Sequence, residues 1–195
     1  MKLKNKYYIM RHGQAISNVK DLCSCWPEKF KNPLTVFGKE MVRESVEKLK
    51  EKLDLSGQTI DLIFASDLLR TKETAQIVGK IFEIKPKFDK RLREINFGVF
   101  NGKNLIGMWK FFKHEEERIK KAPPKGESYT QIVKRMMAVV KDIEKKYKAR
   151  NILLVSHEGP LFLLQGKIMG FSLKETIDSV MLDKRIHKAE VRELN

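Results

Sequence analysis

Five short apolar runs recur along the chain, and longer amphipathic segments lie between them. The runs predict strands over about 7–10, 60–65, 84–88, 152–156 and 189–194. Strands that alternate with helices are typical of an α/β fold with a mostly parallel sheet. We therefore expect a three-layer α/β/α architecture, in which the last strand lies at an edge of the central sheet and can run antiparallel.

The segments between the strands show the three- and four-residue spacing of helices with one apolar face. Val42, Val46, Leu49 and Leu53 predict a helix over about 36–53. A second helix is expected over about 67–82, with Ser66 as its N-cap.

The C-terminal half carries a stronger helical pattern over about 128–147, and Ser128 with Gln131 forms a capping-box start. Gly159-Pro160 is expected to open a further helix that ends near Met169, with Gly170 as its stop, and Ser172 to cap a short last one. The apolar face over 128–147 contains Val133, Met136, Val140, Ile143 and Tyr147.

Residues 96–126 form the least regular stretch, and we call this segment the flap. Aromatic residues and basic residues are mixed in it, and Pro123-Pro124 lies near its end. So long an insertion in a compact domain usually has a function. Two interpretations stay open: a partly helical cover over a site, whose Trp109, Phe111 and Phe112 select the substrate, or a solvent-facing excursion whose aromatic side chains pad the core.

Length and composition favour one globular domain over residues 1–195. The chain has 195 residues and 42% hydrophobic residues, enough for a sizeable core. The net charge of +15 favours anionic partners through long-range steering. Because Lys and Arg are spread along the chain and mixed with Glu, a lysine-rich surface is the preferred interpretation, and nucleic acid is not an expected partner. The oligomeric state is not readable from the sequence.

Cysteine usage and hydropathy indicate a reduced, soluble protein. Cys23 and Cys25 are separated by one residue, which makes a disulfide sterically awkward, and neither has histidine ligands at metal-binding spacing. No apolar run approaches transmembrane length, and the basic N-terminus does not lead into a signal sequence. We expect a cytoplasmic protein without a metal or cofactor, whose two thiols are structural or incidental.

The candidate chemistry begins at Arg11-His12-Gly13, which directly follows the first apolar run. Ligands bind at the carboxyl ends of the strands in open α/β sheets. A buried arginine at such a strand end requires an anion to compensate its desolvation. Asn18 follows within reach of the same anion.

Three further residues fall at comparable boundaries. Arg70 lies in the first turns of the expected helix over 67–82, where its guanidinium and the helix N-terminus can meet one anion. Glu94 follows the strand over 84–88 and suits a proton donor to a leaving oxygen. His157 follows the strand over 152–156 at the next helix start. Together they predict a site for a tetrahedral oxyanion, although each could be a core or surface residue by itself.

With these residues in place, the chain resembles the histidine phosphatase superfamily, also called phosphoglycerate mutase-like. The resemblance covers nearly the whole chain, from Arg11 to about Gly170, and its six pieces occur in the family's order. They are Arg11-His12-Gly13 with Asn18; Leu34-Thr35 with Gly38; Ser66-Asp67 with Arg70, Thr71, Thr74 and Ala75; Leu92-Arg93-Glu94 with Phe97-Gly98 and Gly102; Pro124 with Gly126-Glu127-Ser128; and Ser156-His157 with Gly159. The chain departs from the pattern at Ala15, where many relatives carry Thr or Ser, and at Glu158, where Gly is common.

The resemblance implies a role for each residue. His12 would be the nucleophile that becomes phosphohistidine, and Glu94 the general acid and then the base. Arg11, Arg70 and a histidinium at His157 would surround the phosphoryl group, and Asn18 would contact it or the substrate. Positioning and charge stabilisation are what phosphoryl transfer mostly requires, so no metal is needed. His12 must be neutral at the attacking nitrogen, so its other nitrogen should donate to a fixed acceptor.

The function that follows is hydrolysis of a small phosphorylated substrate. In the family, mutases carry extra length in the flap and at the C-terminus, and this chain is short. Phosphoglycerate mutase-type transfer is the alternative. A non-catalytic phospho-ligand or polyanion-binding protein is a more distant one, and a polyanion binder would lose affinity steeply with salt. The identity of the substrate is beyond the sequence.

Overall fold

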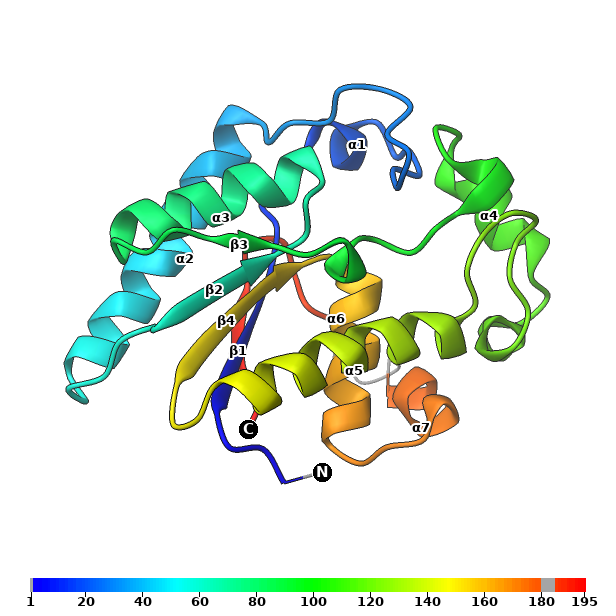
Figure 1. Ribbon diagram of the computed structural model, residues 1–195. Coiled ribbons are helices and arrows are strands. Elements are labelled where there is room, and N and C mark those ends of the chain that lie inside the picture. Colours follow the sequence, from blue (N-terminus) through cyan, green and yellow to red (C-terminus); the bar gives the residue numbers. More distant parts are fainter. Residues whose placement is uncertain (1, 180–184) are drawn as a thin grey trace.

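A computed structural model describes residues 2–179 and 185–195, which form a five-stranded sheet in the order β3-β2-β4-β1-β5 (Figure 1). The strands β1, β2, β3 and β4 run parallel to one another, and β5 pairs antiparallel with β1 at the edge. This confirms the mostly parallel sheet with one antiparallel edge strand. The strands are β1 (Lys6–Arg11), β2 (Leu62–Ala65), β3 (Lys87–Phe88), β4 (Asn151–Ser156) and β5 (Val191–Glu193).

Helices cover both faces of the sheet, as expected (Figure 1). On one face lie α2 (Val36–Asp54) and α3 (Leu69–Ile81), and on the other lie α5 (Tyr129–Lys146) and α6 (Glu158–Ile168). The short helix α7 (Leu173–Asp178) packs beside α6.

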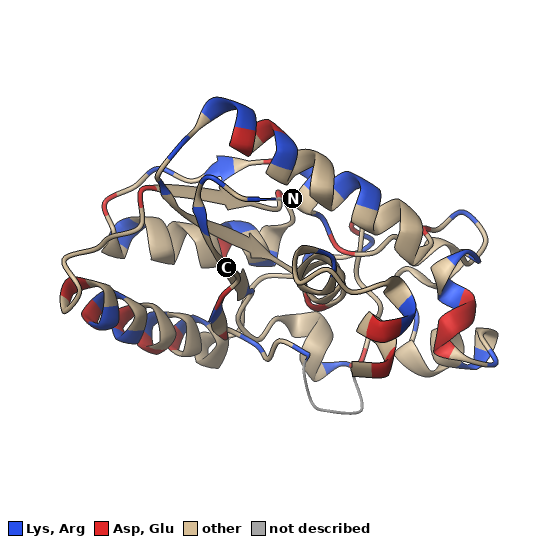
Figure 2. Cartoon of the chain, turned by 90° about the horizontal axis from the view of Figure 1, so that it is seen from below, with Lys and Arg blue, Asp and Glu red and all other residues tan. Residues whose placement is uncertain are grey.

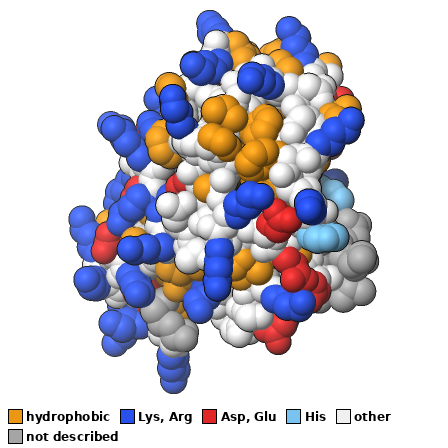
Figure 3. Space-filling view, turned by 90° about the vertical axis from the view of Figure 1, so that its right-hand side faces the viewer, with side chains coloured by type: hydrophobic (Ala, Val, Ile, Leu, Met, Phe, Trp, Pro, Cys, Tyr) orange, Lys and Arg blue, Asp and Glu red, His pale blue; other side chains and the backbone are white. Residues whose placement is uncertain are grey.

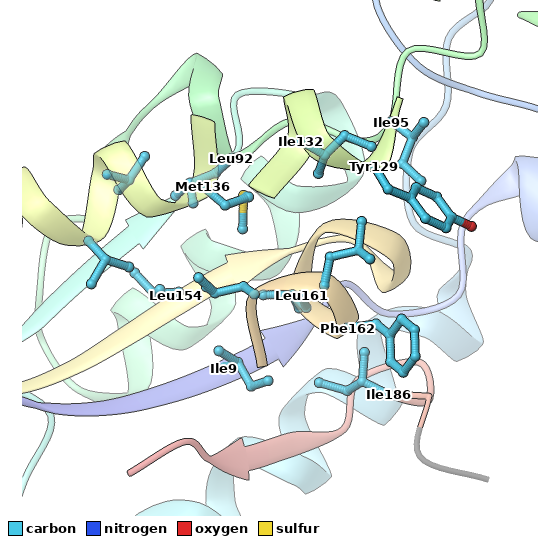
Figure 4. Packing of buried hydrophobic residues seen from close by; sticks show 14 of the residues in the cluster. Ile9, Leu92, Ile95, Tyr129, Ile132, Met136, Leu154, Leu161, Phe162 and Ile186 are labelled. Atoms are coloured by element: carbon cyan, nitrogen blue, oxygen red, sulfur yellow. The ribbon is translucent and has the colours of Figure 1, made fainter. Parts of the chain in front are cut away.

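The two-residue period of β1 divides the core between these layers. Tyr8 and Met10 belong to the cluster under α2 and α3, whereas Tyr7 and Ile9 belong to the cluster under α5 and α6. The second cluster is drawn in close-up in Figure 4. In it, the α5 side chains of Ile132 and Met136 pack with Leu154 from β4 and Leu161 from α6.

The local signals for helix ends agree with the structure in several places. The Ser128 hydroxyl accepts from the Gln131 N–H, and the Gln131 side chain accepts from the Ser128 N–H, so the capping box at α5 is confirmed. Ser172 and Glu175 form the same arrangement at α7. Gly170 follows α6 with φ +88°, a backbone conformation that favours glycine.

Other boundaries were wrong. The helix expected from residue 67 begins at Leu69, and Leu68 occupies the N-cap position instead of Ser66. The Ser66 hydroxyl instead accepts from the Leu68 N–H at 3.3 Å and contacts His157. The strand expected over 84–88 is only two residues long, because the Ile84 N–H bonds back to Gly79 at the end of α3 and Pro86 has no N–H for the sheet.

A further short helix, α1 (Ile16–Val19), was not predicted, because four residues carry too little periodicity.

The flap combines the two alternatives that the sequence left open, a partly helical cover and aromatic side chains that pad the core. It holds two short 3₁₀ segments (Gly98–Phe100 and Glu115–Ile119) and the helix α4 (Leu105–Phe111), which lies beyond the carboxyl ends of the strands (Figure 1). Met108 and Phe112 are buried in the core cluster, and Phe111 packs against it. The flap is therefore a partly helical cover anchored by its own aromatic and apolar side chains.

Charged side chains are spread over the surface. Lys and Arg occur along most helices and alternate with Asp and Glu, most clearly on α2 (Figure 2). No helix among the described residues is long and apolar enough to cross a membrane.

Candidate active site

The two site histidines are neighbours because their strands are neighbours. Arg11 pairs with Ser156 in the β1–β4 register, so His12 and His157 leave adjacent parallel strands at the same edge. Their ring centroids lie 5.2 Å apart with a T-shaped arrangement. Both rings are buried, with exposed fractions of 2% and 0%.

His12 is held in one orientation by two hydrogen bonds. Its Nδ1 lies 2.7 Å from the Gly13 carbonyl oxygen, which can only accept, so Nδ1 carries the proton. Its Nε2 therefore holds a lone pair and accepts from Arg70 Nε at 3.1 Å. Burial, together with the charges of Arg70 and Arg11, lowers the pKa of His12 well below its ordinary value. The imidazole is neutral, with the fixed acceptor that the sequence analysis required.

Arg70 is the second residue of α3 and is 2% exposed. Besides His12, its guanidinium donates to the Ser24 carbonyl oxygen at 2.9 Å and to the Ser24 hydroxyl at 3.4 Å. A Glu28 carboxylate oxygen lies 3.9 Å from Arg70 Nη1. The hydrogen-bond partners of this buried guanidinium are thus neutral groups, and Glu28 and Glu94 are the carboxylates that act on its charge.

Glu94 reaches the site from the loop after β3. Arg135 of α5 holds this loop by donating to the Arg91 and Glu94 carbonyl oxygens at 2.7 and 3.1 Å. The Glu94 carboxylate accepts from the Ile95 N–H at 2.9 Å, and its other oxygen lies 3.8 Å from His157 Nδ1. Burial raises the pKa of Glu94 above its ordinary value, although Arg70 opposes the shift.

His157 is the N-cap residue of α6, and its Nε2 lies 3.0 Å from the Ser66 hydroxyl. Burial, Arg70 and His12 lower the pKa of His157 well below its ordinary value. In this structure these effects favour the neutral imidazole, and a histidinium beside a bound phosphoryl group stays a prediction. Because Ser66 can donate to Nε2, Nδ1 can carry the proton and still donate to an anion.

Two buried donors at this site have no hydrogen-bond partner among the described residues. Among the described residues, the buried side-chain nitrogens without a hydrogen bond are Arg11 Nε, His157 Nδ1 and, elsewhere, Trp26 Nε1. Arg11 Nη1 is occupied, since it donates to the Ile186 carbonyl oxygen at 3.0 Å and to Glu158 at 2.6 Å. Unpaired buried donors are costly, and two of them at one place suit an oxyanion.

Asn18 lies at the same pocket. Its side-chain oxygen accepts from the Ala15 N–H at 2.9 Å, which leaves the amide N–H groups for a ligand. The structure thus brings five of the six candidates, Arg11, His12, Asn18, Arg70 and Glu94, to the wall of one pocket, with His157 directly behind Glu94 and His12.

The flap supplies the outer wall of the pocket. Of the three aromatic residues expected to select the substrate, Trp109 lines it, whereas Phe111 and Phe112 pack in the core. Hydrophobic side chains gather between basic ones on the face that carries the flap (Figure 3). The flap and loop residues at the pocket are Leu22, Ser24, Ile95, Phe97, Leu105, Met108, Trp109 and Arg118.

Arg118 is a site residue that the sequence analysis missed. It is 5% exposed and lies over the rings of Tyr129, Trp109 and Phe112, with the Tyr129 centroid 4.5 Å away. Within the described part of the chain it makes no ion pair or side-chain hydrogen bond. In the sequence it is one basic residue among many in the flap, so no local signal separates it from the rest.

The described His, Cys, Asp and Glu side chains form no metal centre in addition to the pocket. No group of three or more His, Cys, Asp or Glu side chains in residues 2–179 and 185–195 is arranged to hold a metal ion. Cys23 and Cys25 are free and buried, and burial raises the pKa of both thiols to about 11. They are protonated packing groups.

The fold and the site define an α/β protein with a pocket at the carboxyl ends of its strands, lined by Arg11, His12, Arg70 and Glu94. The chain belongs to the histidine phosphatase superfamily (branch 1), whose sequence model matches residues 7–192. This confirms the resemblance drawn from the motifs.

Relatives and solved structures agree with this family. The chain is 30% identical over 172 residues to a probable phosphoglycerate mutase GpmB of Photorhabdus laumondii, covering 84% of this chain and 74% of that protein. A mycobacterial glucosyl-3-phosphoglycerate phosphatase superimposes with a TM-score of 0.82 at 21% identity, covering 97% and 92% of the two chains. YhfR of Bacillus stearothermophilus superimposes with a TM-score of 0.79 at 24% identity, covering 96% and 89%.

Proposed function

We propose that the protein is a metal-independent phosphatase that hydrolyses small phosphate monoesters through a phosphohistidine at His12 Nε2. The observation that carries the proposal is the state of His12. Its Nδ1–H donates to the Gly13 carbonyl oxygen, so Nε2 holds the lone pair, which accepts from Arg70 until a phosphoryl oxygen takes over that hydrogen bond. A neutral, buried imidazole in an oxyanion pocket is suited to nucleophilic attack on phosphorus.

In the first step, the Nε2 lone pair attacks phosphorus and the bond from phosphorus to the ester oxygen breaks. Glu94, whose pKa is raised by burial, gives its proton to the leaving oxygen, which departs as an alcohol. Arg70 Nε, which donates to His12 Nε2, transfers its hydrogen bond to a phosphoryl oxygen as the N–P bond forms.

In the second step, the Glu94 carboxylate takes a proton from water, and the water oxygen attacks phosphorus. The N–P bond breaks and its electron pair returns to His12. Inorganic phosphate leaves, and Glu94 is protonated again for the next cycle. One carboxyl thus serves as acid and then as base.

The unpaired donors stabilise the transferring group. In the described part of the chain, Arg11 Nε and His157 Nδ1 are buried without hydrogen-bond partners, and Arg70 adds a second guanidinium. Fixed donors at the equatorial oxygens are what phosphoryl transfer requires, because negative charge is spread over those oxygens. Asn18 adds amide N–H groups at the pocket wall.

The position of Arg118 favours a substrate whose leaving group carries a negative charge. It lines the same pocket from the flap, and no carboxylate of the described chain pairs with it. Leu105, Met108 and Trp109 contribute apolar surface beside it. We expect the preferred monoester to carry a second negative group beyond an apolar or neutral portion.

Mutase-type transfer is the second candidate, and the names of relatives favour it. The proteins at 28–30% identity from Escherichia coli and Photorhabdus laumondii are called probable phosphoglycerate mutases. By contrast, solved structures named as a glucosyl-3-phosphoglycerate phosphatase and an α-ribazole phosphatase superimpose with TM-scores of 0.82 and 0.74. An assay with 3-phosphoglycerate and a bisphosphate primer separates the two: robust formation of 2-phosphoglycerate would replace hydrolysis by transfer.

The test of the proposal is the trapping of a phosphoenzyme. Rapid acid-free quenching of the protein with a ³²P-labelled monoester should give a labelled chain whose label is lost in acid, as expected for a phosphoramidate bond. His12→Ala should abolish both the label and phosphate release, whereas His114→Gln, at an exposed flap histidine, should change neither. Full activity in His12→Ala would refute the assignment.

A further inference from the structure

Glu158 divides its carboxylate between two arginines. It is the first residue of α6, directly after His157. One oxygen accepts from Arg11 Nη1 at 2.6 Å, and the other accepts from Arg185 Nη1 at 3.0 Å. The side chains of Glu158 and Arg185 are 29% and 24% exposed, and that of Arg11 is 14% exposed, so both pairs are partly shielded from water.

The ion pair between Arg11 and Glu158 determines which N–H groups of the Arg11 guanidinium face a ligand. Arg11 Nη1 is engaged twice, by Glu158 and by the Ile186 carbonyl oxygen at 3.0 Å. Its Nε is buried and has no partner among the described residues. Because a guanidinium is planar and rigid, fixing Nη1 also fixes the direction of the Nε–H bond.

Arg185 carries the connection to the flap. Its Nη2 donates to Glu115 at 2.6 Å, in the flap's second 3₁₀ segment, and the Tyr129 hydroxyl donates to the same Glu115 oxygen at 2.8 Å. The guanidinium also lies over the Phe162 ring, 5.2 Å from its centroid, which restricts its plane. Arg11, Glu158, Arg185 and Glu115 thus form an alternating row of charges from the end of β1 to the flap.

We propose that Glu158 and Arg185 are positioning residues, which hold Arg11 with its Nε directed at the phosphoryl group and lock the flap to that arginine. The inference rests on the proposed function for the role of Arg11. It explains why a carboxylate is tolerated next to an anion pocket: the negative charge of Glu158 is shared by two guanidiniums, and its benefit is the orientation of one of them.

For the removal of Glu158, the positioning role and simple electrostatics predict opposite changes in anion affinity. Removing a negative charge near the pocket should by itself tighten the binding of an anion. If Glu158 acts by positioning, its removal should instead misplace Arg11, weaken the binding of a phosphate-like anion and lower kcat. The same sign should hold for Glu115, which contacts Arg11 only through Arg185 and Glu158.

The experiment combines turnover and binding in Glu158→Ala, Arg185→Met, the corresponding double variant and Glu115→Gln. With p-nitrophenyl phosphate we expect kcat to fall about tenfold in Glu158→Ala and about threefold or more in the other single variants, within the range of coupled charge pairs. The kcat of the double variant should be no lower than that of Glu158→Ala, because both substitutions interrupt the same row of charged side chains. Glu116→Gln, whose carboxylate pairs with Lys174 on the surface, is the matched control and should behave as wild type.

Binding of orthovanadate, measured by calorimetry, keeps the inference testable without turnover. We expect its Kd to rise about tenfold in Glu158→Ala. Additive losses in the double variant, an unchanged kcat, or a lower KM with tighter vanadate binding would overturn the inference. If wild-type protein binds vanadate but forms no phosphohistidine, the proposed function is refuted. The vanadate Kd values of the variants would then still test the positioning role of Glu158 and Arg185. Circular dichroism should show that each variant is folded.

Discussion

Arg70 Nε donates a hydrogen bond to His12 Nε2 over 3.1 Å, although the two residues are 58 positions apart in the chain. The contact joins the end of β1 to the first turn of α3, and it identifies Nε2 as the nitrogen with the lone pair. A buried cation beside the histidine also keeps the imidazole neutral, because it lowers the pKa of His12 together with burial. In the proposed mechanism, the same guanidinium orients the nucleophile and can bind the group that it attacks.

Arg70→Lys should lower kcat by about 10²–10³-fold, as removal of one fixed donor to a developing oxyanion does. A lysine keeps the charge but cannot donate from the guanidinium Nε position or hold the Ser24 carbonyl with the same fork. Steady-state kinetics with p-nitrophenyl phosphate measures the loss. Lys72→Arg, an exposed exchange on the same helix, serves as control and should keep the wild-type kcat.

Glu94→Gln should affect substrates according to their leaving group. With an alkyl phosphate such as glycerol 2-phosphate, kcat should fall by about 10²–10⁴-fold, because the alkoxide must be protonated as it leaves. With p-nitrophenyl phosphate, whose leaving group is stable as an anion, formation of the phosphoenzyme should fall much less. Single-turnover measurement of the released alcohol tests this, and equal losses for both esters would contradict the role of general acid.

The pH dependence follows from the directions of two pKa shifts. Glu94 must be protonated to donate, and burial raises its pKa, so the active form persists to higher pH and is lost as pH rises through the raised value. His12 must be neutral, and its pKa is lowered well below 6.5, so activity is lost on the acid side only far below that value. The profile of kcat/KM for an alkyl phosphate should show both limbs. In Glu94→Gln the alkaline limb should disappear, and its persistence there would assign it to another group.

Arg118→Met should raise KM for monoesters that carry a carboxylate by about tenfold or more, which corresponds to roughly 1.4 kcal/mol. The methionine keeps contact with Tyr129 and Trp109 but removes the cation. For p-nitrophenyl phosphate, which has no second anionic group, KM should change little. Comparison of the two substrates makes the measurement independent of small losses in folding. Lys110→Met, at an exposed position on α4, is the control, and the same selectivity change in both variants would exclude a specific role for Arg118.

Much of the fold could be predicted because its signals are local. The capping box at Ser128 and the stop at Gly170 depend on residues within a few positions of one another, and both appear in the structure. Ser66 shows the limit: it has the sequence character of an N-cap, but its hydroxyl lies beside His157, 91 positions away, and the helix begins later. A side chain with a distant partner cannot be placed by a local pattern.

The sequence by itself determined the α/β class and brought His12, Glu94 and His157 into consideration, because each follows a strand and parallel strands end at one edge of a sheet. Tertiary structure decided what these groups are. It buried both histidines beside Arg70, which lowers the pKa of both imidazoles. It also selected Arg118 and Arg185 from 40 Lys and Arg residues. Burial and charge partners depend on segments far apart in the chain, and these segments meet only in the folded protein.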